Sequence, residues 1–378
     1  MRVAYVSSYP PRECGIATFT EDLVDAIDAT LDPGVVVAIN EPGSKYDYGK
    51  RVKCQIERDS IQSYLDAASW TNKSNTDVVS LQHEFKLFGG NRGEYIIPFL
   101  EHLRKPITTT LHTVHDPVYS QDQEILNKII NVSDSIVVVG SSAAQMLKQQ
   151  HNVGSKLRVI PHGCPNIPLI NREELKASLG FKDRVLISTF GLIGSYKGIE
   201  YVINALPALT TQNPKIMYAV IGETHPEVKR KEGDSYRIML TTLVDQLGLA
   251  EHVTFINRYL TKRELITYLQ ATDIYIAPHI TKDQVSSGTL TYALVAGKAI
   301  ISTPFPHAQE LLSNNGGLLC KFQDSDSIAE GINTILNDAK LRKQIETNSY
   351  TRGRQFLWSE VAKQYIKLFE EITENRVT

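Results

Sequence analysis

The sequence predicts an α/β protein built from two doubly wound, Rossmann-like parallel sheets. Short runs rich in Val and Ile recur along the chain, and a segment with helical spacing follows nearly every run. The runs are continuously apolar rather than alternating, which is typical of parallel strands buried on both faces. A length of 378 residues exceeds one ordinary core and indicates about two domains.

Two series of apolar runs mark the strands that we expect. The first series is RVAYVSS, VVVAIN, DVVSLQH, ITTTLHT, SIVVVGS and LRVIPHG. Three prolines, Pro161, Pro165 and Pro168, then interrupt any regular element before the pattern restarts. The second series is RVLISTFG, IMYAVIGE, HVTFIN, DIYIAPH, AIISTP and GLLCK. The interruption places a domain boundary near residues 165–172.

The stretch of roughly 358–374 predicts a packing helix, because its apolar residues recur on one helical face. We expect a first domain of residues 1–168, with the helix of 355–378 packing back on it, and a second domain of residues 169–354. Open α/β sheets bind ligands at the carboxyl ends of their strands, so two facing sheets would share one central cleft. The residues that follow each strand are therefore the candidates for function.

The composition excludes several classes of partner. Lys and Arg total 40 against 42 Asp and Glu, so no global basic field recommends nucleic acid. The 4 cysteines are scattered without a C-x-x-C pair, which argues against a zinc site and a disulfide framework and favours a reducing cytoplasm. No apolar run approaches the roughly 20 residues that span a bilayer, and no signal segment precedes the first expected strand. We expect a soluble protein, with peripheral membrane contact and oligomeric state left open.

Three strand ends of the first domain carry candidate residues. Gly15 precedes a helix that we expect to start near Ile16 or Ala17. The free N–H groups of such a helix start suit an anion or a sugar hydroxyl, although an ordinary turn explains the glycine equally well. His83 and Glu84 end another strand, and because neighbouring strand residues point to opposite faces, we expect them to bind substrate rather than to act on one atom. His112 directly follows a strand and is the candidate for touching a reacting centre, the alternative being a strand-capping histidine. His112 and His115 form an H-x-x-H pattern, which is only weak evidence for a metal site because the sequence shows no third ligand.

Two helix starts in the second domain suit a phosphate. Lys197 lies in the turn GLIGSYKG, which is no P-loop but offers one mobile positive charge beside backbone donors, the alternative being a solvated lysine. Residues 286–289, SSGT, combine hydroxyls with the N–H groups of a helix start, although Ser287 or Thr289 could equally be a plain N-cap. The two starts converge only if their strands are neighbours. His279 ends a strand just before the second start, which favours a functional role.

The order of these features resembles the retaining glycosyltransferases of family 4, which have the two-Rossmann GT-B fold. The resemblance covers nearly the whole chain through TLHT, VIPHG, GLIGSYKG, VIGE, ATDIYIAPH and GTLTYALVAGKAIISTP. The segments GLIGSYKGIEYVINALP and FINRYLTKREL are most similar to a subgroup associated with mannosyl transfer in bacterial polysaccharide pathways. The resemblance implies a transfer with retention that needs neither metal nor cofactor, in which the leaving phosphate assists deprotonation of the acceptor.

The resemblance also implies roles for individual residues. His112 matches the histidine beside the anomeric centre, Lys197 matches the lysine that holds the donor phosphate, and both are candidate catalytic residues. The candidate donor- or phosphate-binding residues are Gly15, Gly194, Lys197, Gln284, Ser286, Ser287, Gly288, Thr289, Leu290 and Tyr292. The candidate sugar- or acceptor-binding residues are His83, Glu84 and His279.

Three positions depart from the family pattern. Leu192 stands where an arginine is usual, and the paired glutamates of the E-x7-E motif fall on Gln284 and Tyr292. Gln284 can still hydrogen-bond a sugar hydroxyl, but Tyr292 cannot clamp two ribose hydroxyls as a carboxylate does. The leading hypothesis is hexosyl transfer, with mannose from GDP-mannose as donor and a saccharide as acceptor. The alternatives are a retaining phosphorylase that uses phosphate and a sugar 1-phosphate, and a non-catalytic protein that binds sugar nucleotides.

Overall fold

The computed structural model describes residues 1–114 and 120–376 and divides the chain into two compact units. Unit 1 comprises Met1–Gly163 and Trp358–Thr378, and unit 2 comprises Cys164–Leu357. These limits lie five residues before and three residues after those expected from the sequence. The reason is a parallel bridge between Cys164 and Leu357, in which the Cys164 N–H donates to the carbonyl of Phe356 over 2.8 Å. The bridge keeps both of these residues with unit 2.

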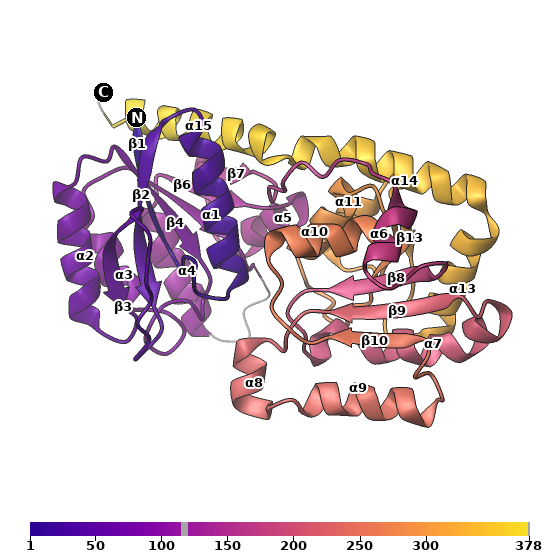
Figure 1. The fold of residues 1–378 in the computed structure, drawn as a ribbon. Helices are drawn as coiled ribbons and strands as arrows, with labels where there is room; N and C mark the ends of the chain where they lie inside the picture. The colour runs from indigo at the N-terminus through magenta and orange to yellow at the C-terminus, as the bar shows by residue number, and fades with distance from the viewer. Residues whose placement is uncertain (115–119, 377–378) are drawn as a thin grey trace. The chain divides into compact units, whose positions relative to one another are not determined.

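Unit 1 holds a seven-stranded parallel sheet in the order β3-β2-β1-β4-β5-β6-β7 (Figure 1). Its strands are β1 (Arg2–Ser7), β2 (Asp32–Asn40), β3 (Val52–Glu57), β4 (Val78–His83), β5 (Ile107–Leu111), β6 (Ser135–Val138) and β7 (Leu157–Val159). Its helices are α1 (Gly15–Asp28), α2 (Ile61–Lys73), α3 (Ile96–His102), α4 (Ser120–Val132), α5 (Ser141–Gln150), the 3-10 turn η1 (Gly154–Lys156) and α15 (Trp358–Glu374). The sequence did not predict β3, because this edge strand exposes alternate residues and lacks a continuous apolar run.

The C-terminal helix α15 completes the core of unit 1 by packing beside α1. Its Trp358 and Tyr365 join Phe19 of α1 in one buried cluster. The hydroxyl groups of Tyr365 and Thr110 are 3.0 Å apart, which ties the helix to β5. Residues far apart in the sequence therefore share this core.

Unit 2 holds a six-stranded parallel sheet in the order β10-β9-β8-β11-β12-β13. Its strands are β8 (Val185–Phe190), β9 (Ile216–Ile221), β10 (Val253–Ile256), β11 (Ile274–Ala277), β12 (Ala299–Ser302) and β13 (Leu318–Leu319). Its helices are α6 (Arg172–Ser178), η2 (Ser195–Lys197), α7 (Ile199–Gln212), α8 (Pro226–Glu232), α9 (Ser235–Gln246), α10 (Lys262–Ala271), α11 (Gly288–Val295), α12 (Pro306–Leu312), α13 (Ser325–Asn337), α14 (Ala339–Gly353) and η3 (Arg354–Phe356).

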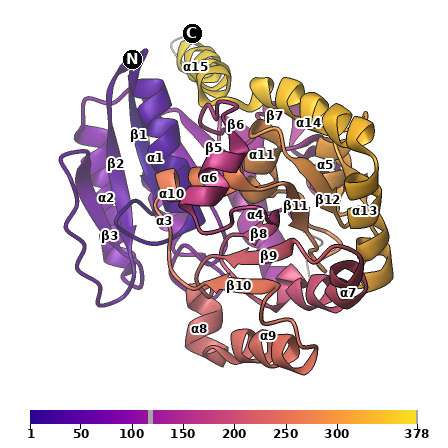
Figure 2. The ribbon, with the colours of Figure 1, turned by 45° about the vertical axis from the view of Figure 1, so that its right-hand side comes forward.

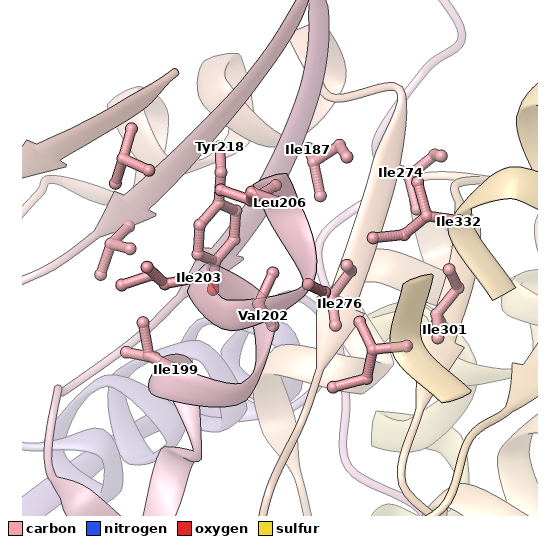
Figure 3. Packing of buried hydrophobic residues seen from close by; sticks show 14 of the residues in the cluster. Ile187, Ile199, Val202, Ile203, Leu206, Tyr218, Ile274, Ile276, Ile301 and Ile332 are labelled. Atoms are coloured by element: carbon pink, nitrogen blue, oxygen red, sulfur yellow. The ribbon is translucent and has the colours of Figure 1, made fainter. Parts of the chain in front are cut away.

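Helices cover both faces of the unit 2 sheet (Figure 2). On one face, Ile276 and Ile301 of the sheet pack with Val202 of α7 and Ile332 of α13 (Figure 3). On the other face, α6, α10, α11 and α12 supply a second apolar cluster. The predicted fold class of two doubly wound parallel sheets is confirmed, because each sheet is parallel throughout and unit 2 shows both faces buried. No helix among residues 1–114 and 120–376 is both long and apolar enough to cross a membrane.

The strand order reverses between β8 and β11 in unit 2 and between β1 and β4 in unit 1. From β8 the chain continues outward to β9 and β10, whereas from β11 it continues outward to β12 and β13 on the other side. Loops that leave two neighbouring strands in opposite directions open a crevice at the carboxyl ends, where doubly wound folds bind ligands. The topology therefore points to residues that follow these strands.

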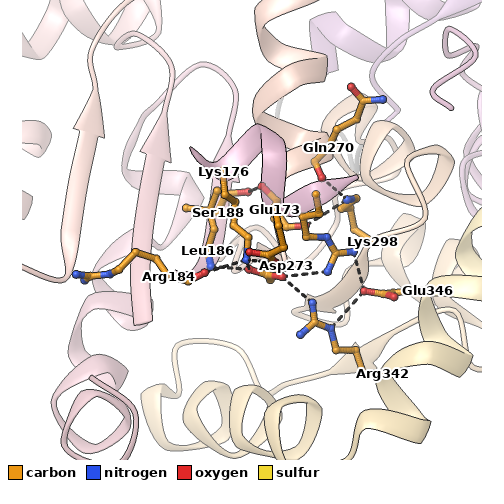
Figure 4. Close-up of polar contacts among 12 residues, drawn as sticks. Glu173, Lys176, Arg184, Leu186, Ser188, Gln270, Asp273, Lys298, Arg342 and Glu346 are labelled. Atoms are coloured by element: carbon orange, nitrogen blue, oxygen red, sulfur yellow. Dashed lines mark hydrogen bonds and ion pairs between the residues drawn. The ribbon is translucent and has the colours of Figure 1, made fainter. Parts of the chain in front are cut away.

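An ion-pair network holds the amino ends of β8 and β11 together (Figure 4). One carboxylate oxygen of buried Asp273 accepts the N–H of Leu186 over 2.8 Å and pairs with Lys176 over 3.0 Å. The other oxygen pairs with Arg172 over 3.0 Å and with Arg342 over 2.7 Å. Burial raises the pKa of Asp273, but these cations outweigh it and hold the pKa below its ordinary value. The network joins α6 and α14 to the two central strands.

Replacement of Asp273 should lower the stability of the protein strongly. In Asp273→Asn, Arg172 and Lys176 keep their charges but lose their shared carboxylate, so we expect the free energy of unfolding to fall by about 3–5 kcal/mol. Urea denaturation measures this fall as a shift of the midpoint with an unchanged slope. The control is Glu227→Gln, which removes the half-exposed partner of Arg230 and should cost less than about 1 kcal/mol. A loss below that of the control would contradict the role given to Asp273.

Candidate functional site

Lys197 lies at the carboxyl edge of the unit 2 sheet, on η2 between β8 and α7. Its ammonium Nζ is 3.4 Å from Nε2 of His279, which follows β11. The two side chains therefore meet across the reversal of strand order, although 82 positions separate them in the sequence. Lys197 is only 5% exposed, and burial lowers its pKa to about 8. Within the described part of the chain, no carboxylate forms an ion pair with this ammonium.

Two glycines, Gly191 and Gly198, allow the turn that carries Lys197 to pack closely against the loop after β11 and the start of α11. Gly191 has φ +121°, and a Cβ placed there would lie 3.0 Å from Cγ2 of Thr289 and 3.4 Å from Nζ of Lys197. Gly198 has φ +64°, and a Cβ there would lie 2.3 Å from the carbonyl oxygen of Pro278. Side chains at either position would be strained and would clash. Lys197 and Thr289 thus approach the same point of the turn, and the two helix starts converge.

The second helix start belongs to α11, and Ser287 caps it. The Ser287 hydroxyl accepts the N–H of Leu290 over 3.3 Å, and the Ser287 N–H donates to Nδ1 of His307 over 2.9 Å. The first turn of a helix leaves further N–H groups, here those of Gly288 and Thr289, without an intrahelical acceptor. The positive end of the helix dipole reinforces them. We call Lys197 together with the start of α11 the anion site.

Gln284 and His279 hold each other behind Lys197. The Oε1 atom of Gln284 is 2.5 Å from Nδ1 of His279, and Nε2 of Gln284 donates to the carbonyl of Ser286 over 2.8 Å. The imidazole of His279 also stacks on Phe305, with 5.2 Å between the ring centroids. Burial, and then the charge of Lys197, lowers the pKa of His279 to about 3. His279 is therefore neutral, and the amide of Gln284 is engaged within the protein.

The remaining donor-site predictions of unit 2 lie in different surroundings. Leu290 and Tyr292 point into the apolar cluster beneath α11, where they are 0% and 8% exposed. Gly194 is buried and accepts the N–H of Lys197 over 2.9 Å, which helps to shape η2. Ser286 is partly buried and offers its carbonyl to Gln284. None of these four residues presents a charged group to the anion site.

In unit 1, His112 lies directly after β5 and is 8% exposed. Gln82 donates from Nε2 to the Ser80 hydroxyl over 3.0 Å, so its Oε1 accepts from Nε2 of His112 over 2.9 Å. The ring of Phe19 packs edge-on against the imidazole, with centroids 4.6 Å apart. Burial, with smaller effects of His162 and His83, lowers the pKa of His112 to about 3. His112 is a neutral, oriented imidazole at the carboxyl edge of the sheet.

His83 and Glu84 have separate surroundings, in agreement with the alternation of strand residues. His83 is fully buried and stacks on Phe88, and neither of its ring nitrogens has a hydrogen-bond partner in the described structure. Burial lowers its pKa to about 3. Glu84 accepts the N–H of Phe85 over 3.0 Å and the hydroxyl of Thr113.

Gly15 begins α1, as the sequence suggested within two residues, and lies open to solvent. The preceding Cys14 is the N-cap, and its side chain makes no capping hydrogen bond, so the helix start is open. His115, the second member of the H-x-x-H pair, lies outside the described residues. Among the residues that are described, no group of three His, Cys, Asp or Glu side chains could hold a metal ion.

Sequence reasoning missed Gln82, which orients His112, and Asp273, which joins the amino ends of β8 and β11. Gln82 stands immediately before the strand-end residue His83, and its place one step inside the strand end was the available signal. Asp273 precedes β11 directly, but its partners come from segments 69 to 101 positions away, and no local pattern links them.

Comparison with known proteins finds glycosyltransferases. Residues 171–352 match the family model of the glycosyl transferases group 1. The chain is 25% identical over 261 residues to an uncharacterized glycosyltransferase of Methanocaldococcus jannaschii, an alignment that covers 67% of this chain and 62% of that protein. It is 22% identical over 229 residues to a phosphatidyl-myo-inositol mannosyltransferase of Mycobacterium leprae, covering 59% of this chain and 56% of that protein. The chain thus spans about three fifths of the length of these two relatives.

Solved structures of similar fold cover nearly the whole chain. HepE of Anabaena in complex with UDP and glucose matches with a TM-score of 0.78 at 15% identity, over 98% of this chain and 99% of that one. Sucrose-phosphate synthase of Thermosynechococcus elongatus matches with a TM-score of 0.79 at 16% identity, over 99% of this chain and 100% of that one. This likeness confirms the predicted GT-B fold class of two Rossmann-like domains.

Removal of the Lys197 charge should stabilise the protein. Burial lowers the pKa of Lys197 to about 8, so the charged ammonium is less stable in the folded protein than in the unfolded chain. The charge therefore lowers the free energy of unfolding, and its removal should raise it. In Lys197→Met, the free energy of unfolding at pH 7 should rise by about 1–3 kcal/mol. Between pH 8 and the ordinary lysine pKa the unfolded chain binds more protons, so the gain should fade as the pH rises through this window.

Urea denaturation of Lys197→Met at pH 7 and at pH 10 measures this difference. The control is Lys182→Met, which alters an exposed lysine before β8 and should change stability by less than about 0.5 kcal/mol at both pH values. Destabilisation by Lys197→Met at pH 7 would mean that the ammonium serves the fold.

Proposed function

We propose that the protein is a retaining, metal-independent glycosyltransferase that moves a hexosyl group, mannose from GDP-mannose, onto a saccharide hydroxyl. The observation that carries this proposal is the anion site. Lys197 is a buried ammonium without a carboxylate partner in the described structure, and it faces the start of α11. A buried charge without a partner is costly, so the site suits a ligand that brings the missing negative charge, such as a phosphate.

The comparisons support a sugar nucleotide as the donor. The matched family is that of the glycosyl transferases group 1, and a relative from Mycobacterium leprae is named a mannosyltransferase. A protein of the same fold from Anabaena was solved with UDP and glucose. GDP-mannose and UDP-glucose are therefore the two donors to compare first.

In the proposed reaction, the bond between the anomeric carbon and the phosphate oxygen breaks while a bond from the acceptor oxygen forms on the same face. Lys197 and the N–H groups of Gly288 and Thr289 stabilise the charge that develops on the leaving phosphate. That phosphate takes the proton of the acceptor hydroxyl, so no carboxylate base is required. His112, neutral and oriented by Gln82, would bind the sugar beside its anomeric carbon.

A second candidate is a retaining phosphorylase that transfers a glycosyl group to inorganic phosphate. The observation in its favour concerns the two positions of the E-x7-E motif. The position of the ribose-binding glutamate holds the buried Tyr292, and the other position holds Gln284, whose amide is engaged by His279 and Ser286. Neither position offers a carboxylate to a ribose. Inorganic phosphate has no ribose to bind, so it would need only the anion site.

Ligand binding separates the two candidates. Thermal-shift measurements with GDP, UDP, GDP-mannose, UDP-glucose, mannose 1-phosphate and phosphate should show stabilisation by GDP and GDP-mannose, because a ligand of the folded state stabilises by mass action. Stabilisation by phosphate and mannose 1-phosphate alone, with release of sugar phosphate from a mannoside, would favour the phosphorylase. Failure of every phosphorylated ligand to bind would contradict both.

Lys197→Met should lower kcat/KM for the donor by about 100-fold or more, because it removes a charge that stabilises the leaving phosphate. In the wild type, donor affinity should be constant below pH 8 and fall above it, as Lys197 loses its proton. Calorimetric titration with GDP from pH 6.5 to 9.5 checks this profile. The matched control Lys182→Met should keep both the rate and the profile of the wild type. Equal activity of the two variants would contradict the proposal.

A further inference from the structure

Three side chains form a line of hydrogen bonds behind the anion site. Gln284 contacts Nδ1 of His279 over 2.5 Å, and Nε2 of His279 faces Nζ of Lys197 over 3.4 Å. Gln284 is tied at its other end to the carbonyl of Ser286. We propose that Gln284 is a positioning residue, which fixes the tautomer of His279 and thereby aims the Lys197 ammonium at the anion site. This inference rests on the proposed function for its last step only.

The direction of each hydrogen bond follows from the chemistry of the amide. The Ser286 carbonyl can only accept, so the donor end of Gln284, Nε2, must face it. The acceptor end, Oε1, then faces His279, and Nδ1 of the imidazole must carry the hydrogen. A neutral imidazole with its hydrogen on Nδ1 leaves a lone pair on Nε2, directed at Lys197. The ammonium therefore donates one hydrogen bond backwards and keeps its other hydrogens for a ligand.

The surroundings of His279 keep the imidazole neutral. It is 2% exposed, Phe305 stacks on it from the loop after β12, and Thr303 donates to its backbone carbonyl over 2.6 Å. The cation that faces it is Lys197, and no carboxylate pairs with His279 in the described structure. Burial and this neighbouring charge lower the pKa of His279 to about 3. Of the two groups, Lys197 is the one that changes charge near neutral pH.

Loss of the amide would let His279 exchange tautomers. With its hydrogen on Nε2, the imidazole would direct a donor at the ammonium, and two donors face to face repel each other. Lys197 would then lose its acceptor, so its protonated form would be less stable and its position less defined. The backbone of Gln284 has its own support, because the N–H of His307 donates to its carbonyl over 3.3 Å. A change of the side chain alone should therefore leave the loop in place.

This role differs from the one expected for a residue at this position. The sequence suggested that Gln284 binds a sugar hydroxyl, but both ends of its amide already have protein partners. Gln284 acts from behind the site, through two other residues. It is for this reason a positioning residue rather than a catalytic one.

The test uses the full chain labelled with 15N at histidine. Long-range 1H–15N correlation spectra distinguish the two tautomers, and loss of a signal in His279→Phe assigns it. We expect the Nδ1–H tautomer in the wild type without any ligand. Gln284→Met has nearly the same length but no acceptor, and should lose this signal pattern, whereas Gln284→Glu keeps an acceptor and should retain it. An Nε2–H tautomer in the wild type, or an unchanged pattern in Gln284→Met, would overturn the proposal.

A second measurement follows the consequence for Lys197. The pH above which GDP affinity falls, near 8 in the wild type, should move to lower pH in Gln284→Met, with affinity at pH 7 reduced about tenfold. The matched control is Gln270→Met on α10, where the wild-type amide donates to the carbonyl of Pro168; this variant should leave both values unchanged. An unshifted pH profile in Gln284→Met would also overturn the proposal. Because the tautomer is read without ligand, a failure of GDP to bind would contradict the proposed function and not this inference.

Discussion

The pairing of β8 with β11 is the constraint on which the rest of unit 2 depends. Ile187 pairs with Ile274 and Ser188 with Tyr275, and the two ends of this pair of strands differ in chemistry. At the amino ends, Asp273 forms ion pairs with Arg172, Lys176 and Arg342. At the carboxyl ends, Lys197 is buried without one in the described structure. The ion pairs of Asp273 thus hold one end of the two strands together, whereas the site that suits the charge of a ligand lies at the other end.

In both units, a glutamine side chain contacts a buried histidine at the carboxyl edge of the sheet. Gln82 contacts His112 and the hydroxyl of Ser80. Gln284 contacts His279 and the carbonyl of Ser286, which can only accept and so settles the direction of the Gln284 amide. Both imidazoles are buried and neutral. Each unit thus presents a histidine that hydrogen-bonds in one direction and carries no charge, and the positive charge of the anion site comes from Lys197.

Much of the fold could be predicted because buried parallel strands read as continuous apolar runs, and all twelve expected runs form strands. The edge strand β3 was not predicted, because its alternate residues face solvent and it contains no continuous apolar run. The start of α11 was recognisable from Ser287 and its neighbours, since a helix cap is a local feature. The contact of Lys197 with His279 could not be predicted, because it depends on β8 and β11 being neighbours in the sheet. The role of Gln284 depends on hydrogen-bond directions that no sequence pattern records.

The division of unit 1 into two chain segments has a consequence for its synthesis. The core that contains Phe19 is closed by Trp358 and Tyr365 of α15, which the ribosome makes only after the whole of unit 2. At translation rates of about 5–20 residues per second, the roughly 190 intervening residues delay this closure by about 10–40 s. Unit 2 is continuous and can fold in that time. Nascent unit 1 meanwhile exposes the apolar face that α15 later covers, and is the part of the chain that chaperones would protect.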